Sequence, residues 1–117
     1  MTDDLPVMAF ADEAVLRRWL EANHDASPGI WVRIAKRGSG VATVSFEAVL
    51  ELGLCFGWSE SKRIRGDGAS YLQRFTPRRS RGTTSERNRT LAIRLVAEGR
   101  MTEAGLEALG MAERGGP

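Results

Sequence analysis

The residues best suited to chemistry are arginines gathered in one short stretch of the chain. Four of the eight residues from Arg74 to Arg81 are arginines. The planar guanidinium group forms paired hydrogen bonds with phosphate or carboxylate. A helix predicted directly after this stretch would add the positive end of its dipole. The segment therefore predicts an anion-binding site that includes Arg74, Arg78 and Arg79.

Four further residues are candidates for the same site. Lys36 and Arg37 belong to a glycine-containing loop and could contact an anion. Trp58 follows a predicted helix, and it could either pack in the core or line a pocket. Asn88 falls in the middle of the apolar face of a predicted helix, where a buried amide without hydrogen-bond partners would cost about 1–3 kcal/mol. Asn88 therefore either ties down a neighbouring loop or lines the pocket.

Catalytic and metal-binding patterns are much weaker. His24 is the only histidine, and its neighbour Asp25 supplies none of the geometry of a catalytic triad. Cys55 is the only cysteine and stands among apolar residues, where burial makes a thiol inert. One Cys and one His cannot complete a structural zinc site, which takes four such ligands. We expect a protein without enzymatic activity that binds no metal and no cofactor. Catalysis by Cys55 or Glu60 is the hypothesis that we rank last.

The charge distribution supports a binding role. Residues 62–100 carry eleven basic and three acidic side chains, whereas residues 1–61 carry five basic and nine acidic ones. Such clustering attracts phosphates, nucleic acid or acidic proteins. The alternative is a solvated surface on which the arginines pair with the acidic first half. Nucleic acid is not favoured because an aromatic content of 7% offers few stacking platforms. The predicted partner is an anionic small molecule or an acidic protein.

A length of 117 residues predicts one domain over residues 1–117. Hydrophobic periodicity predicts an α+β fold in the order α-β-α-β-β-α-α. We expect a small, mainly antiparallel three-stranded sheet packed with about four helices. The expected helices are Asp12 to about Asn23, Phe46 to about Phe56, one capped by Thr83 that ends near Glu98, and a short one after Thr102; the expected strands are Ile30–Ala35, Ser61–Arg65 and Ser70–Phe75.

The start of the chain and its cysteine content bear on location. The first residues are acidic where a secretory signal would be basic. A single cysteine allows no intramolecular disulfide, and no apolar run approaches the ~18 residues of a membrane span. We therefore expect a cytoplasmic protein without membrane insertion.

A series of short motifs runs along nearly the whole chain, from Phe10 to Ala112. They are Trp31 with residues 36–40, Cys55-Phe56-Gly57-Trp58, residues 71–79, Ser85 with Asn88, Gly99-Arg100-Met101-Thr102, and Ala104-Gly105-Leu106. In this order they resemble the YdeI/OmpD-associated family of bacterial proteins, whose members are named for bacteriocin protection. The resemblance implies a role in bacteriocin tolerance or envelope stress, and it implies no reaction.

The chain departs from that family at two places. Ser59-Glu60 stands where the family usually has Ile-Asp, and Thr84 stands where it usually has tryptophan. If the missing aromatic residue lines a ligand site in the family, the ligand or its affinity differs here. The sequence therefore predicts a non-enzymatic, anion-binding domain, with a stress adaptor that binds another protein, or a nucleic-acid-binding domain, as the alternatives.

Overall fold

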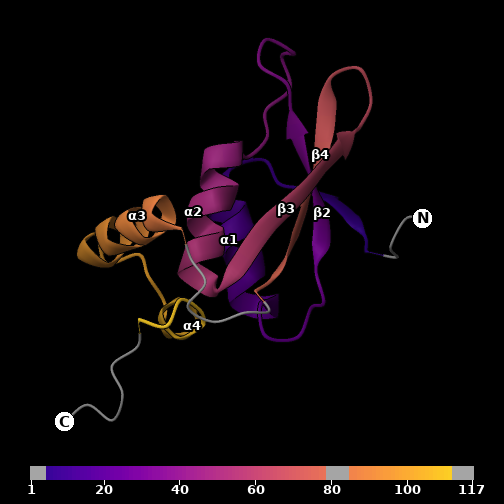
Figure 1. The fold of residues 1–117 in the computed structure, drawn as a ribbon. Coiled ribbons are helices and arrows are strands. Elements are labelled where there is room, and N and C mark those ends of the chain that lie inside the picture. Colours follow the sequence, from indigo (N-terminus) through magenta and orange to yellow (C-terminus); the bar gives the residue numbers. More distant parts are fainter. Residues whose placement is uncertain (1–4, 79–84, 112–117) are drawn as a thin grey trace, which may run out of the picture.

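Four strands form one mixed sheet, and helices α1 and α2 lie side by side against it (Figure 1). The computed structural model describes residues 5–78 and 85–111. The fold is α+β, and its elements in chain order are β1 (Val7–Ala9), α1 (Glu13–Asn23), β2 (Ile30–Ala35), α2 (Phe46–Phe56), β3 (Trp58–Arg65), β4 (Ser70–Pro77), α3 (Glu86–Ala97) and α4 (Glu103–Ala108).

The prediction of a three-stranded, mainly antiparallel sheet is wrong. The sheet has the strand order β1-β2-β4-β3, and β1 runs parallel to β2 while the other two pairs are antiparallel. A strand of three residues is too short to show an alternating pattern. Its pairing with β2 defines β1 instead, and next to it the backbone N–H of Trp31 donates to the carbonyl of Pro6 at 2.8 Å.

Several element boundaries also differ from the sequence prediction. Strand β3 begins at Trp58, directly after Gly57 ends α2 in the left-handed conformation with φ 78°. Helix α3 has Ser85 as its N-cap, whose hydroxyl accepts from the backbone N–H of Asn88. The predicted cap, Thr83, lies outside the described residues.

The core lies between the sheet and the helices that cover it. In an antiparallel pair, residues directly opposite each other point to the same face of the sheet. Ile30 and Val32 of β2 stand opposite Phe75 and Gln73 of β4, so all four side chains face the helices. Ile30, Val32 and Phe75 join one buried apolar cluster with residues of both helices, among them Leu16, Leu20, Val49 and Leu52.

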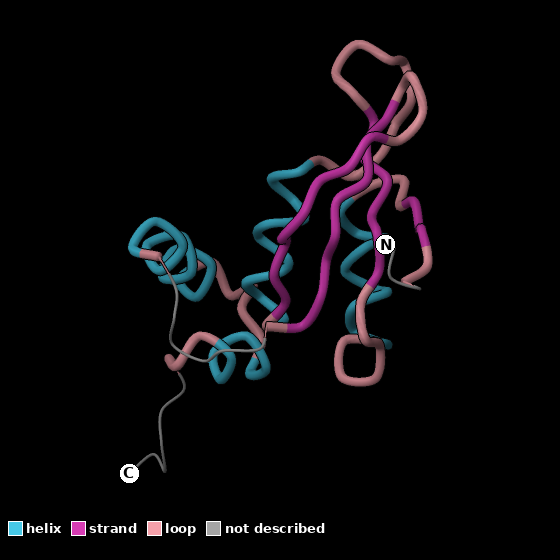
Figure 2. The backbone as a smooth tube through the Cα atoms, turned by 45° about the vertical axis from the view of Figure 1, so that its right-hand side comes forward, coloured by secondary structure: helices cyan, strands magenta, loops and turns pink. Residues whose placement is uncertain are grey.

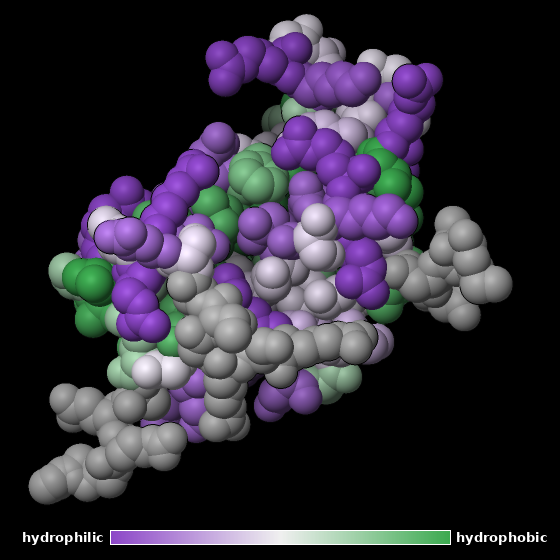
Figure 3. All heavy atoms as spheres, in the orientation of Figure 1, coloured by the Kyte–Doolittle hydropathy of each residue, from purple (hydrophilic) through white to green (hydrophobic). Residues whose placement is uncertain are grey.

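Two loops project together beyond one end of the sheet. One follows β2 and spans residues 36–44, and the other joins β3 to β4, as Figure 2 shows. Hydrophilic side chains gather over this end of the molecule on the face seen in Figure 3. In the part of the chain that the structure describes, no helix is both long enough and apolar enough to cross a bilayer.

Candidate anion-binding site

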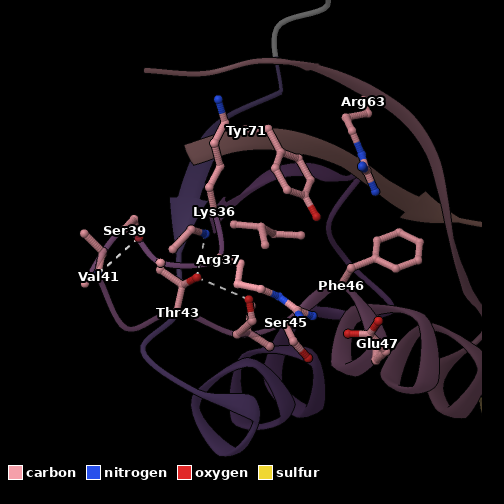
Figure 4. A pocket seen from close by; sticks show the side chains of 15 residues that line it. Lys36, Arg37, Ser39, Val41, Thr43, Ser45, Phe46, Glu47, Arg63 and Tyr71 are labelled. Atoms are coloured by element: carbon pink, nitrogen blue, oxygen red, sulfur yellow. Dashed lines mark hydrogen bonds between the residues drawn. The ribbon is translucent and has the colours of Figure 1, made fainter. Parts of the chain in front are cut away.

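A cavity of about 590 Å³ opens where the loop after β2 and the hairpin strands β3 and β4 meet the start of α2 (Figure 4). We call it the loop–hairpin cavity. Its walls come from the loop after β2, from the first turn of α2 and from the hairpin ends of β3 and β4. The charged and aromatic residues of the lining are Lys36, Arg37, Phe46, Glu47, Arg63 and Tyr71.

A bulge in β3 places Arg63 on this cavity. Glu60 stands opposite Phe75 and Arg63 stands opposite Gln73, so β3 uses three steps where β4 uses two. Strict alternation from Glu60 would have turned Lys62 toward the helices and Arg63 away from them. The one extra residue turns Arg63 toward the helices instead. Bulges next to active sites commonly redirect a side chain in this way. Arg63 therefore faces the same side as Tyr71 and the helices.

The side chain of Gln73 fits into the irregular part of the ladder. Gln73 is only 3% exposed, and its amide nitrogen donates to the carbonyl oxygen of Lys62 at 3.1 Å and to that of Arg74 at 3.3 Å. A bulge leaves backbone groups without ladder partners. The Gln73 amide satisfies one of them, and it thereby holds the bulge in place.

Two aromatic rings orient the guanidinium group of Arg63. Its central carbon lies 4.2 Å from the ring centre of Tyr71 and 5.3 Å from that of Phe46. Contacts of this kind stabilise a cation by about 0.5–1 kcal/mol at exposed sites. A contact with a ring face uses none of the guanidinium N–H groups in a conventional hydrogen bond, so those donors stay available to an anion. An oriented guanidinium edge is suited to paired contacts with an oxyanion.

The remaining polar side chains approach from the loop and from α2. In Figure 4, Arg37 extends from the loop toward the start of α2, where Glu47 lies, and Lys36 directs its amino group away from that helix. Thr43 ties the loop to the sheet, because its hydroxyl accepts from the backbone N–H of Ala35 at 2.8 Å. The cavity thus brings three cations, one carboxylate and two aromatic rings around one space.

Of the predicted site residues that the structure describes, Lys36 and Arg37 line this cavity and the others do not. Trp58 lies in the core, 1% exposed, and its indole N–H donates to the carbonyl of His24 at 3.1 Å. Asn88 is partly buried in the first turn of α3, away from the lining. The core alternative for Trp58 is therefore the one realised.

The predicted arginine segment does not reach the loop–hairpin cavity. Arg74 stands opposite Trp31 in the sheet, and both belong to the sheet face that points away from α1 and α2. Arg78 follows the far end of β4. At about 3.3 Å per residue, it lies roughly 26 Å along the strand from Ser70, whose end borders the cavity. Arg79 lies outside the described residues.

Arg78 has a distinct environment of its own. Burial lowers the pKa of its guanidinium group, and the charge of Glu60 offsets part of that effect. Its Nε atom is buried without a hydrogen-bond partner in the described part of the chain. Arginine nevertheless stays protonated near neutral pH. Arg78 thus remains a cation, separate from the loop–hairpin cavity.

Sequence reasoning missed Arg63, Tyr71, Phe46 and Glu47 as members of a site. In the sequence, Arg63 is one of several charged residues in the predicted strand Ser61–Arg65, and Phe46 and Glu47 belong to an ordinary first helical turn. The one available signal was the pair of glycine-containing loops on either side of these elements. The bulge that joins the residues depends on pairing with β4 and has no signature in the sequence.

A second cavity, of about 500 Å³, lies beside His24 between α1 and α4. Glu21, Phe56, Thr102 and Glu103 are among its lining residues. The Nδ1 atom of His24 is 2.9 Å from the carbonyl of Leu20, and the hydroxyl of Thr102 donates to the carbonyl of Cys55. Both side chains thus contact backbone carbonyls in the last turns of helices, that of α1 for His24 and that of α2 for Thr102. Across residues 5–78 and 85–111, no three His, Cys, Asp or Glu side chains are grouped so as to hold a metal ion.

Comparison with known proteins gives one match. No curated protein and no solved structure matches the chain. The resemblance to the YdeI/OmpD-associated family stays a prediction. A family model described as a domain of unknown function (DUF8412) matches residues 8–108, which is most of the chain. The protein therefore belongs to the DUF8412 family.

Proposed function

We propose that this protein binds a small anionic molecule in the loop–hairpin cavity. The observation that carries the proposal is the position of Arg63, which is stacked on Tyr71 at 4.2 Å within a cavity that Arg37 also lines. A guanidinium group that is already oriented loses less side-chain freedom when a ligand binds. The cavity volume of about 590 Å³ falls within the range of about 300–1,000 Å³ that is usual for small-molecule sites.

Binding explains this arrangement better than catalysis does. A catalytic site needs a nucleophile or base within hydrogen-bond reach of the reacting group. Arginine and lysine near neutral pH are donors, and Glu47 is the one carboxylate that lines the cavity. We therefore propose a binding domain without enzymatic activity. A cytoplasmic location and a role in bacteriocin tolerance or envelope stress are the predictions that accompany it.

The test is ligand binding by wild-type protein and two matched variants. A thermal-shift screen with phosphate, sugar phosphates, nucleotides and carboxylates identifies ligands, and isothermal titration calorimetry then measures their affinities. A ligand at a hundred times its Kd stabilises the folded state by about 2.7 kcal/mol. We expect Arg63→Met to weaken binding at least tenfold, because it removes the charge and both donors of the fork.

Lys62→Met is the control, because it removes the same charge from the neighbouring, exposed residue of the same strand. We expect this variant to bind within about twofold of wild type, since an exposed charge outside the site acts only weakly at physiological ionic strength. Equal losses in the two variants would mean that general positive charge, and not the cavity, attracts the anion. Binding of single-stranded DNA alone, with an affinity that falls steeply with salt, would also overturn the proposal.

A further inference from the structure

The cavity carries a carboxylate among its cations, and this narrows the class of ligand. The charged residues that line the cavity are Lys36, Arg37, Arg63 and Glu47, and their formal charges sum to +2. A phosphate monoester carries a charge of about −1.5 to −2 at pH 7, whereas a single carboxylate carries −1. The charge of the site therefore complements a phosphate monoester most closely.

Glu47 also makes the site unsuited to a bare anion. Within the described part of the chain, no ion pair joins Glu47 to a lysine or arginine, and its side chain lies at the start of α2 near Arg37 (Figure 4). A carboxylate repels a phosphate placed beside it, and it accepts hydrogen bonds from hydroxyl groups. A ligand that places its phosphate at the arginines and a hydroxyl group at Glu47 avoids the repulsion and gains a hydrogen bond.

The walls of the cavity favour a polar ligand body. Phe46 and Tyr71 are the two aromatic residues of the lining, and Arg63 already lies over a face of each ring. Much of the remaining lining is the loop segment from Lys36 to Val41, which contains Ser39 and two glycines. Such a loop offers backbone and hydroxyl groups for hydrogen bonds, and a polyol can use them.

Resting on the proposed function, we propose that the ligand is a phosphate monoester of a polyol, of the sugar-phosphate class. Arg63 and Arg37 hold the phosphate, and Glu47 accepts hydrogen bonds from the hydroxyl groups. In this arrangement Glu47 selects against inorganic phosphate. The selection by Glu47 is a property that general anion binding would not produce.

The test compares ribose 5-phosphate, inorganic phosphate and ribose by titration calorimetry at fixed ionic strength. With the wild-type protein we expect ribose 5-phosphate to bind at least tenfold more tightly than phosphate, and ribose not to bind measurably. With Glu47→Gln we expect opposite changes: the affinity for ribose 5-phosphate falls at least fivefold, whereas the affinity for phosphate rises at least threefold. The rise follows from removal of the repelling charge.

Glu86→Gln is the matched control, because Glu86 occupies the first turn of α3 as Glu47 occupies the first turn of α2. Both substitutions remove an acidic residue from a helix start, and only one of them changes the cavity. We expect Glu86→Gln to leave both affinities unchanged within twofold. Circular dichroism and a thermal melt establish that each variant is folded before its affinity is measured.

The outcomes separate this inference from the proposed function. If phosphate binds wild type as tightly as ribose 5-phosphate does, or if Glu47→Gln strengthens both ligands equally, the sugar-phosphate inference is wrong while the anion site stands. If both ligands bind and Arg63→Met changes neither affinity, the anion site itself is wrong. If neither ligand binds wild type at millimolar concentration, the sugar-phosphate inference is likewise wrong, and the wider anion screen decides the proposed function.

Discussion

The side-chain amide of Gln73 donates to the backbone carbonyl of Lys62 at 3.1 Å, inside the bulge that turns Arg63 toward the helices. A buried residue of β4 thus stabilises the irregular part of its neighbour β3. This relationship connects the core to the candidate site, because the position of Arg63 depends on the bulge. A change at Gln73 should therefore affect both folding stability and ligand affinity.

Replacing Gln73 with leucine tests this dependence. The variant leaves the Lys62 carbonyl without its partner, and we expect the free energy of unfolding to fall by about 1–3 kcal/mol. Urea denaturation followed by circular dichroism measures the change. Lys62→Ala is the control: the backbone carbonyl remains in that variant, so its stability should stay within about 0.5 kcal/mol of wild type. Equal stability of Gln73→Leu and wild type would contradict the role given to Gln73.

The hairpin turn gives a prediction about pH. The carboxylate of Asp67 accepts hydrogen bonds from the hydroxyl of Ser70 at 2.8 Å and from the backbone N–H of Ala69 at 2.9 Å. These bonds, with a smaller contribution from Arg33, lower the pKa of Asp67 below its ordinary value of 3.8. A lowered pKa in the folded state means that the ionised carboxylate stabilises the fold above the unfolded pKa, and that this stabilisation is lost as the pH falls through the folded pKa.

Urea denaturation of wild type and Asp67→Asn at pH 7, 5 and 3 measures this contribution. We expect wild type to be the more stable protein by the same margin at pH 7 and pH 5. The margin should narrow at pH 3, where the unfolded chain binds the proton more readily than the folded protein does. A margin that stays constant from pH 7 to pH 3 would mean that ionisation of Asp67 contributes nothing.

A cluster of ion pairs around Arg100 links α1, α2 and the end of α3. Arg100 lies 2.8 Å from Glu13 of α1, 2.9 Å from Glu51 of α2 and 3.2 Å from Glu98, which follows α3. Burial lowers the pKa of Arg100, but hydrogen bonds with Glu51 and Glu98 and the charge of Glu13 raise it by more, so the net shift is upward. The guanidinium group therefore joins three elements through its charge.

We expect Arg100→Met to lower the free energy of unfolding by about 1–3 kcal/mol, because it removes hydrogen bonds to charged groups and leaves three carboxylates near one another. The loss should be smaller at 0.5 M than at 0.05 M sodium chloride, since salt screens these partly exposed charges. Urea denaturation at both salt concentrations provides the measurement. Arg18→Met, at an exposed position of α1, is the control, and an equal loss in that variant would refute the role of the cluster.

The thiol of Cys55 gives a prediction about reactivity. Cys55 is 0% exposed, and burial raises the pKa of its thiol despite the opposing charges of Arg100 and Arg17. The thiolate is the reactive form, so both effects suppress reaction. We expect a thiol reagent such as DTNB to label the folded protein at least a hundredfold more slowly at pH 8 than the protein unfolded in urea. Rapid labelling of the folded protein would contradict the inert role.

The sequence by itself determined much of the local structure. Asp12, Ser45 and Thr102 cap three helices as their types and positions predict, and Gly57 ends α2. The alternating residues of Ile30–Ala35 form β2. These features depend on residues that are close in the sequence. An example is the hydrogen bond from a backbone N–H to the side-chain oxygen of the capping residue three positions earlier. A short stretch of sequence is therefore enough to predict them.

Only the tertiary structure decided how distant residues combine. The parallel pairing of β1, the bulge that selects Arg63 over Lys62, and the separation of Arg74 and Arg78 from Lys36 all arise from pairing between strands. A shift of one residue in a strand turns each following side chain to the other face of the sheet. Charge composition correctly indicated that cations are abundant, but the register of β3 against β4 determines which of them share a cavity.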